Sequence, residues 1–152
     1  MIEGLFETHL FVKDLERSID FYKNILKLEP CDLIDERPLA FFWIGKGKKA
    51  MLGLWEKPKD QIDIRHFAFQ CSTEFILNES ENYLHSHGIK THNFLKDETH
   101  GPMVFAWMPA LSIYFEDPDG HSLEFISMLP QQPQKELAVV SYDEWIEKSK
   151  SR

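Results

Sequence analysis

The arrangement of apolar and polar residues predicts a strand, a helix and three further strands in the first part of the chain. Alternation over residues 5–12 is typical of a strand, and apolar residues at helical spacing over 15–26 predict a helix, which Glu29-Pro30 is expected to end. Three short apolar runs, separated by charged or glycine-containing turns, then predict strands at 31–34, 39–44 and 50–55. The charged, proline-broken segment Lys57–Asp60 is the best candidate for a linker.

The same order of elements then returns, at a period of roughly sixty residues. Residues 65–71 predict a strand, and residues 75–87 predict a helix that ends before Gly88. Strand-like runs follow at 89–93, 103–107, 112–115 and 122–128. A half-sheet with one helix cannot cover both of its faces, so two such halves are expected to pair around a cupped groove. The pattern predicts an α+β fold with two βαβββ modules.

Two local motifs indicate where helices begin. Asp14 is a plausible N-cap for the first helix. After a linker at 131–134, the sequence Ser141-x-x-Glu144 is a capping box that opens a short C-terminal helix containing Trp145. We expect this helix to pack on the domain or on a second subunit.

Composition narrows the class of protein. A chain of 152 residues supports one domain or two small modules, and 43% hydrophobic residues argue against disorder. The net charge of −8 argues against nucleic acid as a partner, and no apolar run is long enough to span a membrane. Without a signal-peptide pattern, Cys31 and Cys71 are expected to be free thiols in a reducing cytoplasm.

The most informative stretch is residues 112–125, in which two apolar runs flank the turn Asp117-Pro118-Asp119-Gly120. Proline and glycine supply the backbone angles of a tight turn, so a hairpin is predicted. Glu124 stands between apolar neighbours in the second strand. It either faces solvent, or it is a carboxylate that binds a cation, because burying an unpaired acid is costly.

This stretch resembles the closing hairpin of the vicinal oxygen chelate superfamily, which includes glyoxalase I, fosfomycin-resistance enzymes, extradiol dioxygenases and bleomycin-resistance proteins. The shared pattern is an aromatic strand, Asp-Pro-x-Gly, and a strand carrying a metal-ligand Glu, here Glu124. The resemblance implies a curved, cupped mixed sheet with a metal at its centre. It places module one at 4–57 and module two at 62–129 within a domain of residues 1–130, with 131–152 as a C-terminal linker and helix.

The resemblance also implies metal ligands on the first and last strands of each module. In module two these are His66 and Glu124. In module one, the family usually has a ligand His seven positions before the Asp that opens the helix, which here is Asp14, and this spacing favours Glu7. His9, however, lies on the same strand face about 7 Å away. Glu7 gives a site with one His and two carboxylates, whereas His9 gives a two-His, one-carboxylate triad.

A fourth family ligand is not expected here. Aligning Leu52-Gly53-Leu54 with the segment around Glu124 puts Gly53 at that ligand position, and glycine has no ligand atom. Glu56 is expected to be a solvated charge at the strand end. Three protein ligands leave positions open for substrate and water, as at a catalytic ion.

Candidates for substrate binding are less specific. Trp43, Trp55 and Trp107 could form an apolar wall, and His100 could be a proton-transfer residue on a lid. Arg37 and Arg65 are expected to be solvated. Four other histidines look like surface residues: His85, His87, His92 and His121.

The expected function is that of an enzyme dependent on one divalent metal (Zn, Mn, Ni or Fe), with Glu124 as its catalytic residue. It would act on a small oxygen-chelating substrate as a lyase or isomerase, or by thiol or water transfer. The alternatives are a metal-free binding protein of the bleomycin-resistance kind and an extradiol-type dioxygenase. A homodimer is expected, because each module leaves a strand edge to cover.

Overall fold

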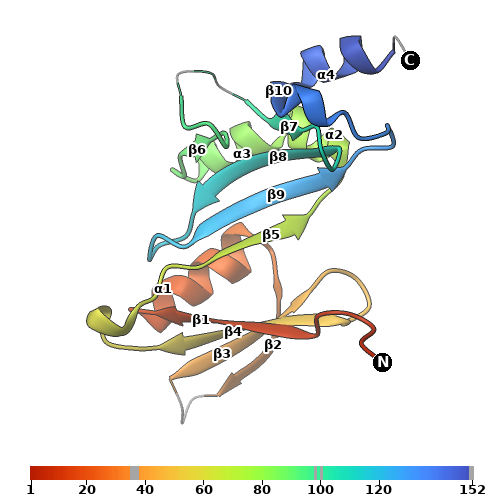
Figure 1. The fold of residues 1–152 in the computed structure, drawn as a ribbon. Helices are drawn as coiled ribbons and strands as arrows, with labels where there is room; N and C mark the ends of the chain where they lie inside the picture. Colours follow the sequence, from red (N-terminus) through yellow and green to blue (C-terminus); the bar gives the residue numbers. More distant parts are fainter. Residues whose placement is uncertain (35–37, 98, 100, 151–152) are drawn as a thin grey trace. The chain divides into compact units, whose positions relative to one another are not determined.

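The structure is a computed structural model that describes residues 1–34, 38–97, 99 and 101–150. It has the expected α+β fold, with two mixed sheets and few helices (Figure 1). The chain forms two compact units. The first contains residues 1–65 together with 117–121, and the second contains 66–116 and the chain from Ser122 onward.

The first unit contains one sheet and one helical segment. The sheet has the order β1-β4-β3-β2, in which β1 runs parallel to β4 and the other pairs are antiparallel. Its elements are β1 (Glu7–Val12), α1 (Leu15–Asp20), the π-helical turn η1 (Phe21–Ile25), β2 (Glu29–Ile34), β3 (Leu39–Ile44) and β4 (Ala50–Glu56). A short 3-10 turn, Lys59–Gln61, follows in the expected linker.

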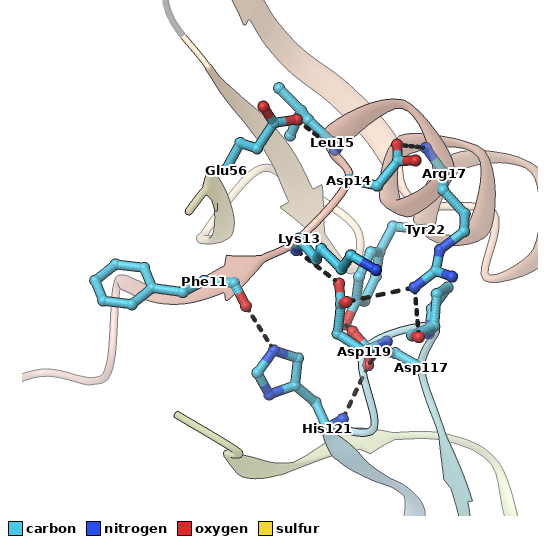
Figure 2. Close-up of polar contacts among 11 residues, drawn as sticks. Phe11, Lys13, Asp14, Leu15, Arg17, Tyr22, Glu56, Asp117, Asp119 and His121 are labelled. Atoms are coloured by element: carbon cyan, nitrogen blue, oxygen red, sulfur yellow. Dashed lines mark hydrogen bonds and ion pairs between the residues drawn. The ribbon is translucent and has the colours of Figure 1, made fainter. Parts of the chain in front are cut away.

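Strand β1 and helix α1 form as their sequence predicts. Leu10 and Val12 are buried, whereas His9 and Phe11 on the opposite face are exposed. The Asp14 carboxylate accepts a hydrogen bond from the Arg17 amide (3.0 Å), which confirms Asp14 as the N-cap. The Leu15 amide donates to the Glu56 carboxylate (2.9 Å), so this exposed acid also caps the helix (Figure 2).

The end of the first helical segment differs from expectation. Glu29 and Pro30 were expected to end the helix, but they begin β2, where Glu29 pairs with Trp43. The chain leaves the helical segment earlier, at Lys27, which has a positive φ of 57°. Sequence alone favoured the proline as the breaker, whereas a proline at the start of a strand is equally tolerated.

The second unit contains a larger sheet of order β10-β7-β8-β9-β5, with β6 paired to β8. Here β5 runs parallel to β9, and β8 and β9 form the expected antiparallel hairpin. Its elements are β5 (His66–Gln70), α2 (Thr73–Asn78), α3 (Ser80–Ser86), β6 (Thr91–His92), β7 (Met103–Phe105), β8 (Ala110–Glu116), β9 (Ser122–Met128), a 3-10 turn (Lys135–Leu137), β10 (Val139–Ser141) and α4 (Tyr142–Ser149).

The predicted helix at 75–87 is in fact two helices. The first begins at Thr73 with Ser72 as N-cap, and the backbone breaks at Glu79 (φ −128°) before α3 starts. Ser141 is the N-cap of α4 as predicted, because its hydroxyl accepts from the Glu144 amide (3.2 Å), whereas the Glu144 carboxylate pairs with Lys148. Trp145 of α4 is fully buried. Within the described ranges, no helix has the length and apolar character needed to cross a membrane.

The turn at residues 117–121 packs in the first unit, although its flanking strands belong to the second (Figure 2). The Tyr22 hydroxyl donates to Asp117 (2.8 Å), and the Lys13 amide donates to Asp119 (3.1 Å). His121 accepts from the Arg65 amide at Nδ1 (3.1 Å), so its proton lies on Nε2 and is donated to the Phe11 carbonyl (2.9 Å).

His121 is therefore not a surface residue, as the sequence suggested, but is fully buried. Its partners are 56 and 110 residues away in the chain, beyond the reach of any local pattern.

Candidate functional site

Strands β5 and β9 place two of the predicted ligands side by side in the second unit. In the parallel pair, Ala68 lies opposite Glu124, and His66 is two residues before Ala68 on the same face. The small side chain of Ala68 leaves room beside the carboxylate. As a result, His66 Nε2 lies 3.2 Å from Glu124 Oε2.

The tautomer of His66 follows from its other ring nitrogen. Nδ1 lies 3.0 Å from the Ser122 carbonyl oxygen, which only accepts, so Nδ1 carries a proton. In the neutral imidazole, Nε2 then has a free lone pair directed at a carboxylate oxygen. This contact is favourable only when a proton or a cation lies between the two atoms. An imidazole whose second nitrogen donates to a carbonyl is also how metal-ligating histidines are usually oriented.

Glu124 is buried, and one of its two carboxylate oxygens has no hydrogen-bond partner among the described residues. The side chain is almost fully inaccessible, and the oxygen without a partner is Oε1. The buried Ser112 hydroxyl on β8 is likewise without one. Burial raises the pKa of Glu124, and the polar side chains of Ser112, Tyr114 and His66 act in the opposite direction. An orphaned buried oxygen beside an available imidazole lone pair fits a divalent cation.

A pocket opens beside His66 in the same unit. Its volume is about 250 Å³, and its lining residues are His66, His92, Phe94, Lys96, Tyr114 and Ser122. The Tyr114 ring stacks between the two imidazoles, with centroid distances of 5.6 Å to both His66 and His92. Burial raises the pKa of Tyr114 well above its ordinary value, and the nearby charge of Glu124 adds to the shift. The phenol is therefore neutral at physiological pH.

The first unit pairs the other two predicted ligands. On β1, His9 Nε2 lies 3.3 Å from Glu7 Oε1. On β4, the Trp55 indole nitrogen donates to His9 Nδ1 (2.7 Å). Trp55, predicted as part of an apolar substrate wall, thus holds a histidine through its indole nitrogen, and both His9 and Glu7 remain partly open to solvent.

The other two predicted tryptophans lie in different units. Trp43 packs under the Lys48 ammonium and is paired with Met51 of β4, which is in turn paired with Glu7, whereas Trp107 packs against Phe105 in the second unit. Arg65 pairs with Asp63. His100 and Arg37 lie outside the described residues.

Sequence reasoning missed most of the pocket, namely His92, Phe94, Lys96, Tyr114 and Ser122. The alternation of residues 110–116 could have indicated Tyr114, because it puts Ser112 and Tyr114 on the sheet face that carries Glu124.

In the part of the chain that the structure describes, no three His, Cys, Asp or Glu side chains gather as a metal cluster. Each unit by itself brings two candidates together, His66 with Glu124 and His9 with Glu7. The three-ligand site predicted from the sequence stays a prediction.

Comparison with known proteins identifies relatives of this chain. It is 30% identical over 132 residues to the metallothiol transferase FosB of Staphylococcus saprophyticus, covering 82% of this chain and 76% of that protein. Among solved structures, it resembles the integron cassette protein HFX_CASS4 from a Halifax Harbour sewage metagenome, at 37% identity and a TM-score of 0.72. That match covers 84% of this chain and all of the other.

It also resembles the fosfomycin resistance protein FosX of Listeria monocytogenes, solved with Mn(II) and sulfate, at 27% identity and a TM-score of 0.63. This match covers 86% of the chain and 94% of FosX. A family model, described as the Glyoxalase/Bleomycin resistance protein/Dioxygenase superfamily, matches residues 4–125. The chain therefore belongs to this superfamily, as the hairpin around Glu124 suggested.

Proposed function

We propose that this protein is a divalent-metal-dependent enzyme that adds a thiol or water to a small, anionic, electrophilic substrate such as a phosphonate epoxide. The observation that carries the proposal is the pair formed by His66 and Glu124. The imidazole has a lone pair on Nε2, and the buried carboxylate keeps an oxygen without a partner. The names of the relatives FosB and FosX, a metallothiol transferase and a fosfomycin resistance protein, support the class of reaction.

His66 and Glu124 would hold the ion. When bound, a divalent ion supplies Lewis-acid polarisation of the substrate oxygen. The Ser122 carbonyl keeps the His66 ring oriented and fixes its tautomer. Ala68 keeps the space beside Glu124 clear.

The pocket next to His66 suits the organic part of such a substrate. Tyr114 and Phe94 offer ring surfaces, while the exposed Lys96 ammonium can attract a phosphonate or carboxylate. In the reaction, the sulfur or water oxygen bonds to an epoxide carbon and the C–O bond breaks. The released oxygen then takes the proton that the nucleophile gives up. The neutral Tyr114 phenol, buried beside Glu124, adds no negative charge to a site that binds an anion.

Metal analysis and a turnover assay test the proposal together. We expect the purified wild type to bind one equivalent of Mn(II), and His66→Gln and Glu124→Gln to lose it. The control His87→Gln, at an exposed histidine, should keep it. With fosfomycin and either cysteine or water as nucleophile, phosphorus NMR should show product. Chelation should lower the rate at least about 100-fold, because metal polarisation contributes several kcal/mol.

A wild type that binds no divalent ion, or that binds one but leaves the epoxide unchanged with every nucleophile, would overturn this function. The first outcome would favour the metal-free binding protein.

We also expect a homodimer. The strands β1 and β5 each end a sheet with one unpaired edge in the described structure, and such edges are commonly covered by another chain. Sedimentation equilibrium at micromolar concentration should give twice the chain mass of 17.9 kDa. A monomer would contradict this expectation.

A further inference from the structure

Three residues of the second unit form a row across its sheet, and His92 ends the row. His92 on β6 is paired with Tyr114 on β8, and Tyr114 is paired in turn with Glu124 on β9. Directly paired residues in antiparallel strands have their side chains on the same face, so His92 shares a face with Glu124. With neighbouring strands about 4.8 Å apart, their backbones are roughly 10 Å apart. That spacing leaves room for a small substrate between the two side chains.

The imidazole of His92 is held in a defined orientation. Its ring lies almost parallel to that of Tyr114, with 13° between the planes and centroids 5.6 Å apart. Its Nδ1 lies 2.9 Å from the Asn93 carbonyl oxygen, which only accepts, so Nδ1 carries the proton of the neutral ring and Nε2 has a free lone pair. Asn93 is itself buried and fixed, because its side chain donates to the Thr99 carbonyl (2.6 Å) and accepts from the Lys96 amide (2.9 Å).

Among the described residues that line the pocket, His92 is the group suited to accept a proton near neutral pH. Burial raises the pKa of Tyr114, so its phenol is neutral and holds its own proton. The ammonium of Lys96 has only donors, and Nε2 of His66 already faces Glu124. The other two lining residues are a phenylalanine and a serine, which do not take up protons in this range. An imidazole is the ordinary side chain that changes charge between pH 5 and 8.

From this geometry we infer that His92 is a catalytic residue, the base that accepts the proton of the attacking thiol or water. This inference rests on the proposed function and deepens it, because it assigns the proton transfer of that reaction to one atom. As the sulfur or water oxygen bonds to the epoxide carbon, its proton passes to Nε2 of His92 and the C–O bond breaks. The imidazolium then gives the proton to the released oxygen, so His92 is neutral again after each turnover.

The first part of the test needs neither metal nor turnover. Long-range ¹⁵N–¹H NMR of metal-free protein at pH 8 should show His92 protonated at Nδ1 and bare at Nε2. His121 is an internal reference for the opposite tautomer, because its Nδ1 accepts from the Arg65 amide. A proton on Nε2 of the neutral His92 ring would overturn the inference, since that nitrogen could not then act as a base.

The second part measures the rate of fosfomycin turnover with cysteine or water. His92→Ala and His92→Gln should each lower this rate about 100–10,000-fold, as expected when a general base is lost, and both should keep one equivalent of Mn(II). Glutamine fills much of the space of the imidazole but cannot take up a proton, so its effect separates proton transfer from packing. Added imidazole should raise the rate of the alanine variant at least about tenfold and leave the glutamine variant unchanged.

The control is His87→Ala, at an exposed histidine, which should keep the wild-type rate with or without imidazole. If the wild type turns over fosfomycin and His92→Gln does so equally fast, the inference is wrong, whereas the proposed function stands. Loss of Mn(II) from a folded His92 variant, or an alanine variant that imidazole does not restore, would give His92 another role and also overturn the inference. A wild type that leaves fosfomycin unchanged would end the proposed function and the inference together.

Discussion

At the scale of single residues, ring tautomers distinguish histidines that the sequence leaves alike. His66 and His121 both interact with backbone groups, but His66 donates from Nδ1 whereas His121 accepts there. His9 accepts at Nδ1 from an indole. A histidine in a strand is thus a candidate metal ligand only when its second nitrogen is the donor, and this depends on residues far away in the chain.

Gly53→Ala should show how closely the His9 ring is packed. The new methyl group must displace either the imidazole or Phe41, so we expect a loss of about 1–3 kcal/mol in the free energy of unfolding. Urea titration measures the change. Gly4→Ala is the control, because a Cβ there meets nothing within 4 Å. Equal stability of the two variants would contradict the packing described for His9.

The two cysteines should differ in reactivity. Burial raises the pKa of Cys71 to about 11, so at pH 8 only about one thiol in a thousand is ionised. Cys31 is exposed on β2. Iodoacetamide at pH 8 should alkylate Cys31 at least about tenfold faster, as followed by mass spectrometry of peptides. In denaturant the difference should largely disappear, and equal rates in the native protein would contradict the burial of Cys71.

At the scale of elements, the sequence predicted the strands and helix caps that neighbouring residues determine. The strands at 39–44 and 122–128 have the expected bounds, and the caps Asp14 and Ser141 are where their motifs put them. Long-range features were missed. β10 is only three residues long and exists because it pairs with β7, and the break at Glu79 leaves the helical periodicity of its neighbours intact.

The candidate site was likewise predicted only in part. His66 and Glu124 were predicted from a strand, a turn and a family resemblance, and the structure brings them together. The pocket residues Phe94 and Lys96 come from a segment without regular structure, where no periodicity indicates which side chains meet.

Helix α1 gives an element-scale prediction. Asp14→Ala removes the side-chain acceptor for the Arg17 amide, so we expect the free energy of unfolding to fall by about 0.5–2 kcal/mol. Asp14→Asn, which keeps an acceptor, should recover most of the loss. Urea titration of both variants beside Asp60→Ala, at an exposed aspartate in the linker, separates capping from a general effect of charge. A stable Asp14→Ala would mean that Glu56 alone caps the helix.

At the scale of the whole molecule, the turn at 117–121 supplies the first unit with hydrogen bonds from a distant part of the chain. His121→Ala leaves the Arg65 amide and the Phe11 carbonyl without their partner in a partly buried place. A fully buried group of this kind costs about 1–3 kcal/mol, so we expect the two partly buried groups together to lower the free energy of unfolding by about 1–3 kcal/mol. Chemical denaturation monitored by tryptophan fluorescence measures it. His87→Ala, at an exposed histidine, should change stability far less, and a similar loss there would contradict the role given to His121.

The same turn has a consequence for how the protein is made. While only the first 65 residues have left the ribosome, the Tyr22 hydroxyl and the Phe11 carbonyl lack their partners Asp117 and His121. The missing piece is synthesised more than fifty positions later, which at about 5–20 residues per second takes several seconds. During this interval the nascent N-terminal half is an incomplete fold. Its apolar surfaces must not contact other nascent chains during this time. A gene cut between the two halves would encode a first product that lacks the turn at 117–121 and so cannot form the whole first unit.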